Sequence, residues 1–372
     1  MKILSCSDIH LDTFKSFAIA EDNPVSNSRL ENILEGLHLF FEYGSNNGVQ
    51  VYVFNGDTFN NRLKMNPNFY YYCVKRIVEE FRKTPSGSKL FINIGNHCEM
   101  TRYIHPNSNE IFSSYSEKNH NIIVQEDEAT SYQLDDDSDI ILIPYTENIE
   151  ESKRKIKTVL DCHGDRPTTI FAHLGVAGSL SGRWSHRLGG AYSLGDLGWS
   201  NSNVVGIHLG HYHLGQSLKK KGNKEAFYEG NLVPINFNDV KDSGLGLDKG
   251  FWLSDSITGE HELIKTTDVL PTFNIIDLAN TSMSSDDILT LAKDNYVRLI
   301  IHNESDYKDM KEKLSDSLSN IEIQLKKDIE EVHELDINET TSDSEIVKKY
   351  FSKYYPDNKR LMKKALEFLE EG

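Results

Sequence analysis

Five short motifs rich in aspartate and histidine could together hold metal ions. Their side chains offer carboxylate, imidazole and carboxamide groups, which suit Mn, Fe or Zn better than metals that prefer thiolates. Seven candidate ligands are too many for one ion, but they serve two ions if a carboxylate bridges them. Two ions about 3.5–4 Å apart can clamp a phosphodiester and activate the water that attacks it. The motifs are Asp8-Ile9-His10, Gly56-Asp57, Gly95-Asn96-His97, His173 and Gly210-His211-Tyr212-His213.

Each motif also has a purely structural interpretation when it is considered alone. Asp8-Ile9-His10 could be a helix cap or a surface pair, Gly56-Asp57 a common turn, and Gly95-Asn96-His97 the end of a strand. His173 could be an ordinary histidine of a sheet. Gly210-His211-Tyr212-His213 is stronger evidence for metal binding by itself, because alternating positions of an extended chain place both of its imidazoles on one face. Only the five together, in this order, favour a metal centre.

Each of the five motifs follows a predicted strand. Short apolar runs rich in β-branched residues alternate with amphipathic segments, a pattern that predicts an α/β fold with layered sheets and helices. In such sheets, ligand sites gather at the carboxyl ends of the strands. The runs that precede the motifs are Lys2–Cys6, Val49–Asn55, Lys89–Ile94, Thr168–Ala172 and Val204–Leu209. Further strands are expected at Ile140–Pro144, Ala226–Tyr228 and Gly250–Leu253, and helices at Arg29–Tyr43 and Phe69–Arg82.

Composition indicates a soluble, intracellular protein. The chain has 372 residues, of which 38% are hydrophobic and 26% charged, as in ordinary globular proteins. No apolar run approaches the roughly 20 residues that a membrane helix needs. The apolar start is broken at once by Ser5 and Asp8, so no signal peptide is expected. The four cysteines have no CxxC spacing and are typical of reduced thiols in the cytoplasm.

The formal net charge of −17 argues against strong DNA binding by this chain alone. Proteins that bind DNA through its phosphates are usually basic, at least on one face. Divalent metals can supply positive charge where a phosphate reacts. If the substrate is DNA, we therefore expect a partner to contribute much of the binding.

The character of the sequence changes after the last motif. We expect a catalytic domain over residues 1–265, a small α/β capping domain over 266–335, and a linker with terminal helices over 336–372. A strand, a helix and a strand are expected at Asn295–Asn303, Asp306–Leu318 and Ile321–Lys327, which is a βαβ unit. The first terminal helix has an apolar stripe that fits docking in a partner's groove or packing on the capping domain. The stripe consists of Ile346, Val347, Tyr350, Phe351 and Tyr354.

The five motifs resemble those of the calcineurin-like metallophosphoesterases, whose fold is a two-sheet sandwich flanked by helices. Within that superfamily, most of residues 1–265 is similar to SbcD-type DNA repair nucleases, especially the recombination exonuclease subunits of tailed phages. Beyond residue 265 the resemblance is one of architecture alone. The narrower resemblance rests on Met1-Lys2-Ile3-Leu4, Asp8-Ile9-His10-Leu11, Gly56-Asp57-Thr58-Phe59, Tyr228-Glu229-Gly230-Asn231 and Lys249-Gly250-Phe251.

The resemblance implies roles for individual residues. One metal ion would be bound by Asp8, His10, Asp57 and His213, and the other by Asp57, Asn96, His173 and His211, with Asp57 as the bridge. His97 matches the histidine that acts on the leaving oxygen or stabilises the charge of the phosphorane. Two positions depart from the pattern. Cys98 replaces the usual acidic residue after His97, so that Glu99 could substitute for it, and Asn60 stands where similar proteins often carry histidine or aspartate.

The resemblance also implies a function and partners. It implies a DNA exonuclease or endonuclease with two divalent ions, Mn²⁺ first and Mg²⁺, Fe²⁺ or Zn²⁺ as alternatives. It further implies a homodimer and an SbcC-type coiled-coil ATPase onto which the terminal helices dock, in a bacterial host of a phage. The segment Phe69-Tyr70-Tyr71-Tyr72 could line the dimer surface or belong to the core.

Two other functions remain open at this point. One is a phosphatase or small-molecule phosphodiesterase of the same fold, although Gly56-Asp57-Thr58-Phe59-Asn60 lacks the Asp-Arg-Gly continuation of Ser/Thr phosphatases. A small substrate would also not need the capping unit and the terminal helices. The other is a scaffold subunit that keeps the fold and the ligands but has weakened catalysis. The presence of Cys98 in place of the usual acidic residue supports this alternative.

Overall fold

The computed structural model describes residues 1–61, 65–98, 107–125, 128–162, 164–180, 191–239, 248–281, 283–314, 319–326, 343–355 and 358–370. Over these residues the strands form two six-stranded sheets and one three-stranded sheet. The two large sheets and their flanking helices confirm the predicted α/β sandwich. None of the described helices is long and apolar enough to cross a membrane.

Each large sheet has four neighbouring parallel strands; the first sheet adds two antiparallel strands at one edge, and the second adds one antiparallel strand at each edge. In the first sheet β1, β2, β3 and β4 are parallel, and in the second β6, β7, β8 and β10 are parallel. The first sheet has the order β12 (His261–Lys265), β11 (Gly250–Asp255), β1 (Lys2–Cys6), β2 (Val51–Phe54), β3 (Ser88–Ile92), β4 (His120–Val124). The second has the order β5 (Thr130–Gln133), β6 (Asp139–Ile143), β7 (Thr168–His173), β8 (Val204–Gly210), β10 (Lys224–Tyr228), β9 (Gln216–Lys221).

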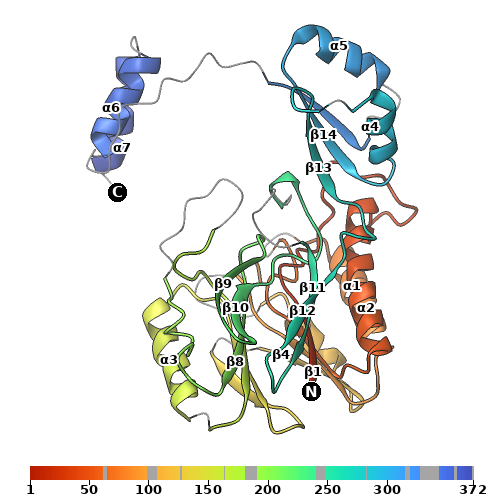
Figure 1. The fold of residues 1–372 in the computed structure, drawn as a ribbon, viewed down its shortest axis with the longest axis vertical. Coiled ribbons are helices and arrows are strands. Elements are labelled where there is room, and N and C mark those ends of the chain that lie inside the picture. The colour runs from red at the N-terminus through yellow and green to blue at the C-terminus, as the bar shows by residue number, and fades with distance from the viewer. Residues whose placement is uncertain are drawn as a thin grey trace.

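The alternation of side chains along the strands separates three apolar layers. Along β2, Val51 and Val53 point toward the second sheet, whereas Tyr52 and Phe54 point toward the helices. Helices α1 (Ser28–Asn46) and α2 (Pro67–Phe81) contribute to the same core as the outer face of the first sheet. Helix α3 (Ile149–Cys162) covers the outer face of the second sheet (Figure 1). This sandwich brings the carboxyl ends of both sets of parallel strands to a common edge.

A smaller unit follows β12, the last strand of the first large sheet. Strands β13 (Phe273–Asp277), β14 (Tyr296–Ile301) and β15 (Ile321–Leu325) pair in parallel, with α4 (Ser285–Ala292) and α5 (Glu304–Lys313) between them in sequence. The predicted βαβ unit is confirmed by β14, α5 and β15, although residues 315–318 and 327 lie outside the described residues, and β13 adds a strand that we did not expect. The division of the chain at residues 265 and 335 stays a prediction.

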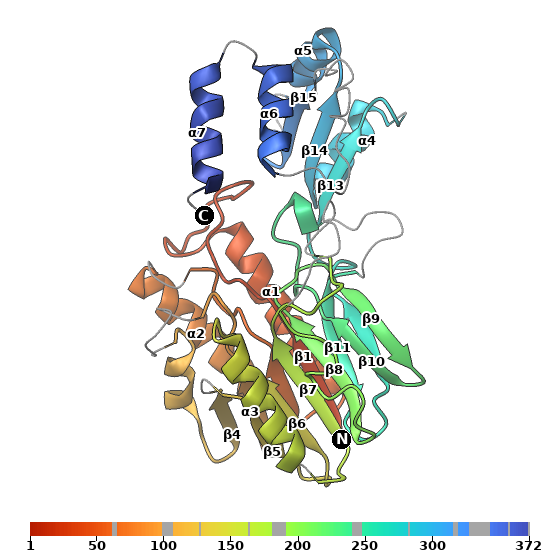
Figure 2. The same ribbon diagram turned by 90° about the vertical axis from the view of Figure 1, so that its left-hand side faces the viewer.

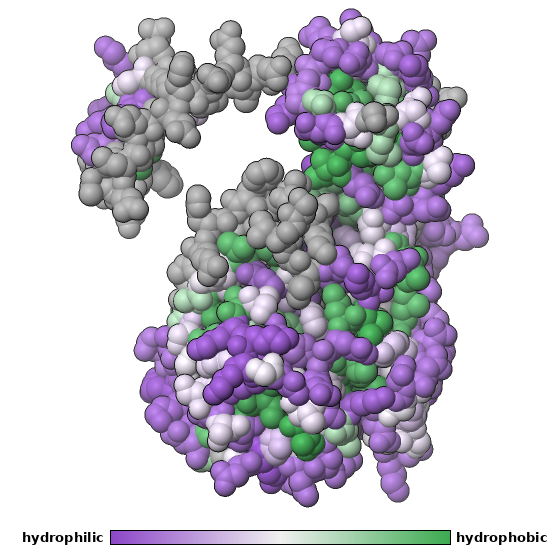
Figure 3. Space-filling model, in the orientation of Figure 1, coloured by the Kyte–Doolittle hydropathy of each residue, from purple (hydrophilic) through white to green (hydrophobic). Residues whose placement is uncertain are grey.

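The last two helices, α6 (Asp343–Tyr354) and α7 (Lys359–Glu370), pack on each other. Figure 1 shows this pair set away from the smaller unit, and Figure 2 shows the two helices side by side. In the space-filling view, hydrophilic residues cover most of the described surface, and apolar residues gather where the smaller unit meets the sandwich (Figure 3). Two short 3₁₀ helices, η1 (Glu110–Tyr115) and η2 (Phe237–Asp239), complete the described elements.

Candidate metal centre

The first two motifs lie in sharp turns directly after β1 and β2. Asp8, His10 and Asp57 have φ angles of 50°, 50° and 48°, a left-handed conformation that is uncommon for residues other than glycine and costs of the order of 1–3 kcal/mol each. The two turns are joined by a hydrogen bond of 2.9 Å from the His10 amide to the Asp57 carbonyl. The backbone therefore holds two carboxylates and one imidazole in strained turns at the sheet edge.

Two glycines of the motifs make room for ligand side chains. A Cβ atom on Gly56 would lie 2.1 Å from Nδ1 of His173, and Gly56 itself has a φ of 91°. A Cβ atom on Gly95 would lie 2.2 Å from Oδ1 of Asp57. Because both contacts are shorter than any real Cβ contact, the glycines are needed for the close approach of Asp57 and His173 to the strand ends.

One group of ligand atoms lies around His10. Its Nε2 is 2.9 Å from Nε2 of His213 and 3.8 Å from Oδ1 of Asp8. These three residues come from the loops after β1 and β8, so they join the two large sheets. Their ligand atoms all lie within 4.8 Å of one another.

The second group of ligand atoms lies around His173. Its Nε2 is 3.3 Å from Oδ2 of Asp57 and 3.3 Å from Oδ1 of Asn96. The same Asn96 oxygen is 2.8 Å from Nδ1 of His211. Asp57 lies between the two groups, because its Oδ2 is also 3.7 Å from Nε2 of His10. The structure therefore brings all seven predicted ligands together, with Asp57 in the shared position.

Comparison with known protein families identifies the family of this chain. A model of the calcineurin-like phosphoesterase family matches residues 1–242. The chain belongs to the calcineurin-like phosphoesterase family. Among solved structures, a dimetal phosphatase from Danio rerio is 11% identical, with a TM-score of 0.43, and the match covers 69% of this chain and 92% of that one. No curated protein sequence matches the chain.

Family membership makes the chain a hydrolase of phosphoesters and implies two divalent metal ions. The donor atoms of this phosphoesterase fit such ions. Asp8 and Asp57 are 0% and 2% exposed, and burial alone would raise the pKa of both carboxyls. The nearby imidazoles outweigh burial, so the pKa of Asp57 falls to about 2 and that of Asp8 falls below its usual range. Two buried, ionised carboxylates next to several imidazoles are a donor set suited to divalent cations.

The imidazoles of the phosphoesterase are oriented by their second ring nitrogens. Nδ1 of His173 lies 2.8 Å from the Asn55 carbonyl, which can only accept, so in the neutral imidazole Nδ1 carries the proton and the lone pair of Nε2 faces the centre. Nδ1 of His213 lies 3.2 Å from Oδ1 of Asp239. Such outer hydrogen bonds fix the tautomer and the direction of metal-binding histidines.

Asp239 is a site residue that the sequence analysis missed. It lies in η2, far from the motifs in sequence, and its Oδ2 accepts hydrogen bonds from Asn231 Nδ2 at 3.1 Å and from the Ile235 amide at 2.9 Å. The buried ammonium group of Lys249 donates to the carbonyl of His213 and lies near enough to Asp239 to help lower its pKa. Asn231 and Lys249 belong to motifs noted above for resemblance, which is the only sequence feature that points to this network.

His97 is oriented by the backbone of Asn60. Its Nδ1 lies 2.6 Å from the Asn60 carbonyl oxygen, and its ring packs edge-on against that of His10, with centroids 4.8 Å apart. Cys98 does not take this role. Its Sγ accepts hydrogen bonds from the Gly95 amide at 3.4 Å and from Asn109 Nδ2 at 3.3 Å, and burial with the charge of Asp57 raises its pKa to about 12. Glu99 lies outside the described residues.

The apolar stripe of the terminal helices is partly exposed. Tyr350 is 42% exposed, and its ring packs against those of Phe351 and Tyr355. Ile346 and Val347 are half-buried. The side chain of Tyr354 lies outside the described residues.

Proposed function

We propose that this phosphoesterase is a DNA nuclease subunit of the SbcD type, which hydrolyses phosphodiester bonds during recombination or repair. The observation that carries the proposal is the convergence of seven ligand side chains, with Asp57 in the shared position and His97 beside them. The phage-type motifs around Gly56-Asp57 and Glu229-Gly230-Asn231, and the units that follow residue 265, support a polymeric substrate. In this proposal the protein works in the cytoplasm of a bacterial host.

The residues divide into three tasks. The seven ligands would hold two divalent ions, Mn²⁺ by preference, which when bound stabilise charge on the phosphate and activate the attacking water. His97 presents Nε2 to the leaving oxygen, because Nδ1 is occupied by the Asn60 carbonyl. Asp239 and the Asn55 carbonyl keep His213 and His173 in the tautomers that leave Nε2 free toward the centre.

A direct test compares three substrates with the full-length chain and Mn²⁺: a labelled single-stranded DNA, bis-p-nitrophenyl phosphate and p-nitrophenyl phosphate. Metal-dependent cleavage of DNA, with the diester preferred to the monoester, is the expected result. Preferential turnover of the monoester would establish a phosphatase instead. Metal binding without hydrolysis of any substrate would establish a scaffold subunit.

The proposal includes an SbcC-type ATPase that docks on the α6–α7 pair. This pair packs on itself, and both Tyr350 and Leu361 keep more than two fifths of their surface exposed, at 42% and 48%. Removing residues 343–372 should leave cleavage of short DNA intact and abolish capture of the ATPase in a pull-down. A truncated chain that still captures the ATPase would contradict this docking.

A homodimer is also part of the proposal, with α2 as its surface. Tyr71 is 60% exposed on this helix, whereas Phe69 is buried, so the aromatic segment serves both the core and the surface. Tyr71→Glu should shift the molecular mass in light scattering from dimer to monomer. An unchanged mass would place the dimer surface elsewhere.

A further inference from the structure

The Asn60 carbonyl that orients His97 lies in a turn without regular secondary structure. Hydrogen bonds from neighbouring segments must therefore hold this carbonyl in place. The segments 10–12 and 57–60 run side by side, and the Leu11 amide donates to the Thr58 carbonyl at 2.9 Å. The Asn60 amide donates to the Leu11 carbonyl at a longer 3.2 Å. The backbone pairing therefore weakens at Asn60, the residue whose carbonyl receives the hydrogen bond from His97.

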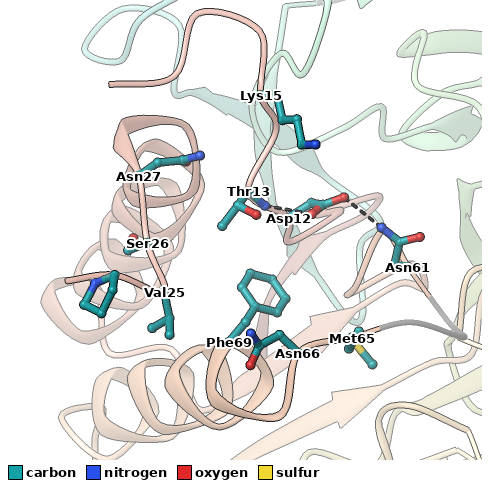
Figure 4. A pocket seen from close by; sticks show the side chains of 11 residues that line it. Asp12, Thr13, Lys15, Val25, Ser26, Asn27, Asn61, Met65, Asn66 and Phe69 are labelled. Atoms are coloured by element: carbon teal, nitrogen blue, oxygen red, sulfur yellow. Dashed lines mark hydrogen bonds between the residues drawn. The ribbon is translucent and has the colours of Figure 1, made fainter. Parts of the chain in front are cut away.

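Asp12 supplies hydrogen bonds where the backbone pairing ends. Its Oδ2 accepts from Nδ2 of Asn60 at 2.7 Å and from Nδ2 of Asn61 at 3.1 Å, while its Oδ1 accepts from the Thr13 amide at 2.8 Å. Figure 4 shows Asp12 joined to Thr13 and Asn61 in the wall of a hollow of about 410 Å³. Hydrogen bonds to a carboxylate are roughly twice as strong as neutral ones, so one side chain clamps both asparagines.

We infer that Asp12 is a positioning residue for phosphodiester hydrolysis: it holds Asn60, whose carbonyl in turn holds the imidazole of His97. The inference rests on the proposed function, since it needs His97 to act on the leaving oxygen. Asp12 itself is not part of the two ligand groups around His10 and His173. In this chain the hydrogen bonds of Asp12 perform the task of orienting His97. Cys98 is not available for this task, because it is buried and bonded to Gly95 and Asn109.

The test is a set of variants assayed on DNA with saturating Mn²⁺. His97→Ala should lower kcat by about 100-fold, as loss of a general acid or base does. Asp12→Ala should lower kcat by about 10-fold, as loss of an orienting partner does, with KM and bound metal unchanged. Asp22→Ala, which removes an exposed aspartate of the same loop region, is the matched control and should match the wild type.

Double variants separate positioning from general stability. If Asp12 acts through His97, Asp12→Ala should have no further effect on kcat in the His97→Ala background. Asn60→Ala keeps the carbonyl but loses the clamp, so it should repeat the effect of Asp12→Ala, and the two together should be no worse than one. This second variant provides the test even if Asp12→Ala folds poorly in thermal unfolding.

Two results would overturn the inference in different ways. An equal loss from Asp12→Ala with and without His97, or a loss of bound metal, would show that Asp12 does not act through His97. The proposed function would then still stand on the effect of His97→Ala. Full activity of His97→Ala would instead remove His97 from the mechanism and the inference with it, while metal-dependent cleavage of DNA remains a separate result.

Discussion

Two clusters of histidine and acidic side chains join the large sheets, and they differ in how their polar atoms are paired. In the core, Nδ1 of His208 lies 2.9 Å from Oε1 of Glu229, and its Nε2 lies 3.3 Å from the hydroxyl of Ser254. Ser5 of β1 donates to the same Glu229 oxygen. Both ring nitrogens of His208 thus have a protein partner within this cluster.

In the candidate metal centre the same residue types are arranged differently. Nε2 of His10 and Nε2 of His213 lie 2.9 Å apart, and two buried carboxylates lie next to them. The second nitrogen of His213 is held by Asp239, so Nε2 faces the other ligands, and imidazole nitrogens and carboxylate oxygens converge on one place. Burial and residue type are alike in the two clusters. The convergence of two carboxylates with several imidazoles is what identifies the cluster built for cations.

The largest expected effect comes from the shared carboxylate. Asp57→Asn should remove both ions and lower DNA cleavage by at least about 1000-fold, because both ligand groups use this residue and two-metal chemistry needs both ions. Metal content by mass spectrometry and a cleavage assay measure the two effects. Asp139→Asn is the matched control, since Asp139 is also buried but pairs with Arg166 at 2.7 Å, away from the centre. Normal metal content in Asp57→Asn would contradict the bridge.

Removal of metal should destabilise the protein by an amount that depends on metal concentration. Ions that bind only the folded chain stabilise it by about 2.7 kcal/mol per site at a concentration 100 times Kd. Thermal unfolding with chelator and with a series of Mn²⁺ concentrations checks this expectation. The Asp57→Asn variant should lose the dependence on Mn²⁺, whereas an identical response in the two proteins would place the ions elsewhere.

The core cluster should affect stability without affecting metal. Glu229→Gln alters the partner of buried His208 and should lower the free energy of unfolding by about 1–3 kcal/mol, the typical loss for a disturbed buried hydrogen bond. Denaturant unfolding measures the loss, and metal content should stay at the wild-type value. A fall in metal content together with stability would contradict the independence of the two clusters.

The smallest effect concerns pH. Burial lowers the pKa of His208 below its ordinary value of 6.5, and Glu229 opposes this only in part. Below about pH 6.5 the unfolded chain therefore binds a proton that the folded chain does not, so stability falls as pH falls, by at most about 1.4 kcal/mol per pH unit. The difference in unfolding free energy between wild type and His208→Gln isolates this contribution. A difference that does not change between pH 7.5 and 5.5 would contradict it.

Much of the fold could be predicted because the central strands are apolar runs. The run Lys2–Cys6 coincides with β1, and the runs before the other motifs correspond to β2, β3, β7 and β8. Edge strands such as β9 were missed, because Gln216–Lys221 is mostly exposed and polar and so lacks the alternation that marks a buried face. The convergence of the ligands could be predicted because parallel strands end at a common edge.

The supporting groups could not be predicted from residue types. Asp239 reaches His213 because η2 packs beside the loop after β8, a relation that only tertiary structure creates. Asn60 was noted for its side chain, yet its contact with His97 is made by its carbonyl, and a backbone atom has no signature in the sequence. The same holds for Asn55, whose carbonyl orients His173.

The central claim is that Asp57 is shared by two cations held between the sheets. A crystal structure of the full-length chain grown with Mn²⁺, measured at a wavelength where manganese scatters anomalously, tests it most directly. The account predicts two anomalous peaks about 3.5–4 Å apart, both in contact with Asp57, one beside His10 and His213 and the other beside Asn96 and His173. A single peak, or two peaks of which one does not touch Asp57, would contradict it.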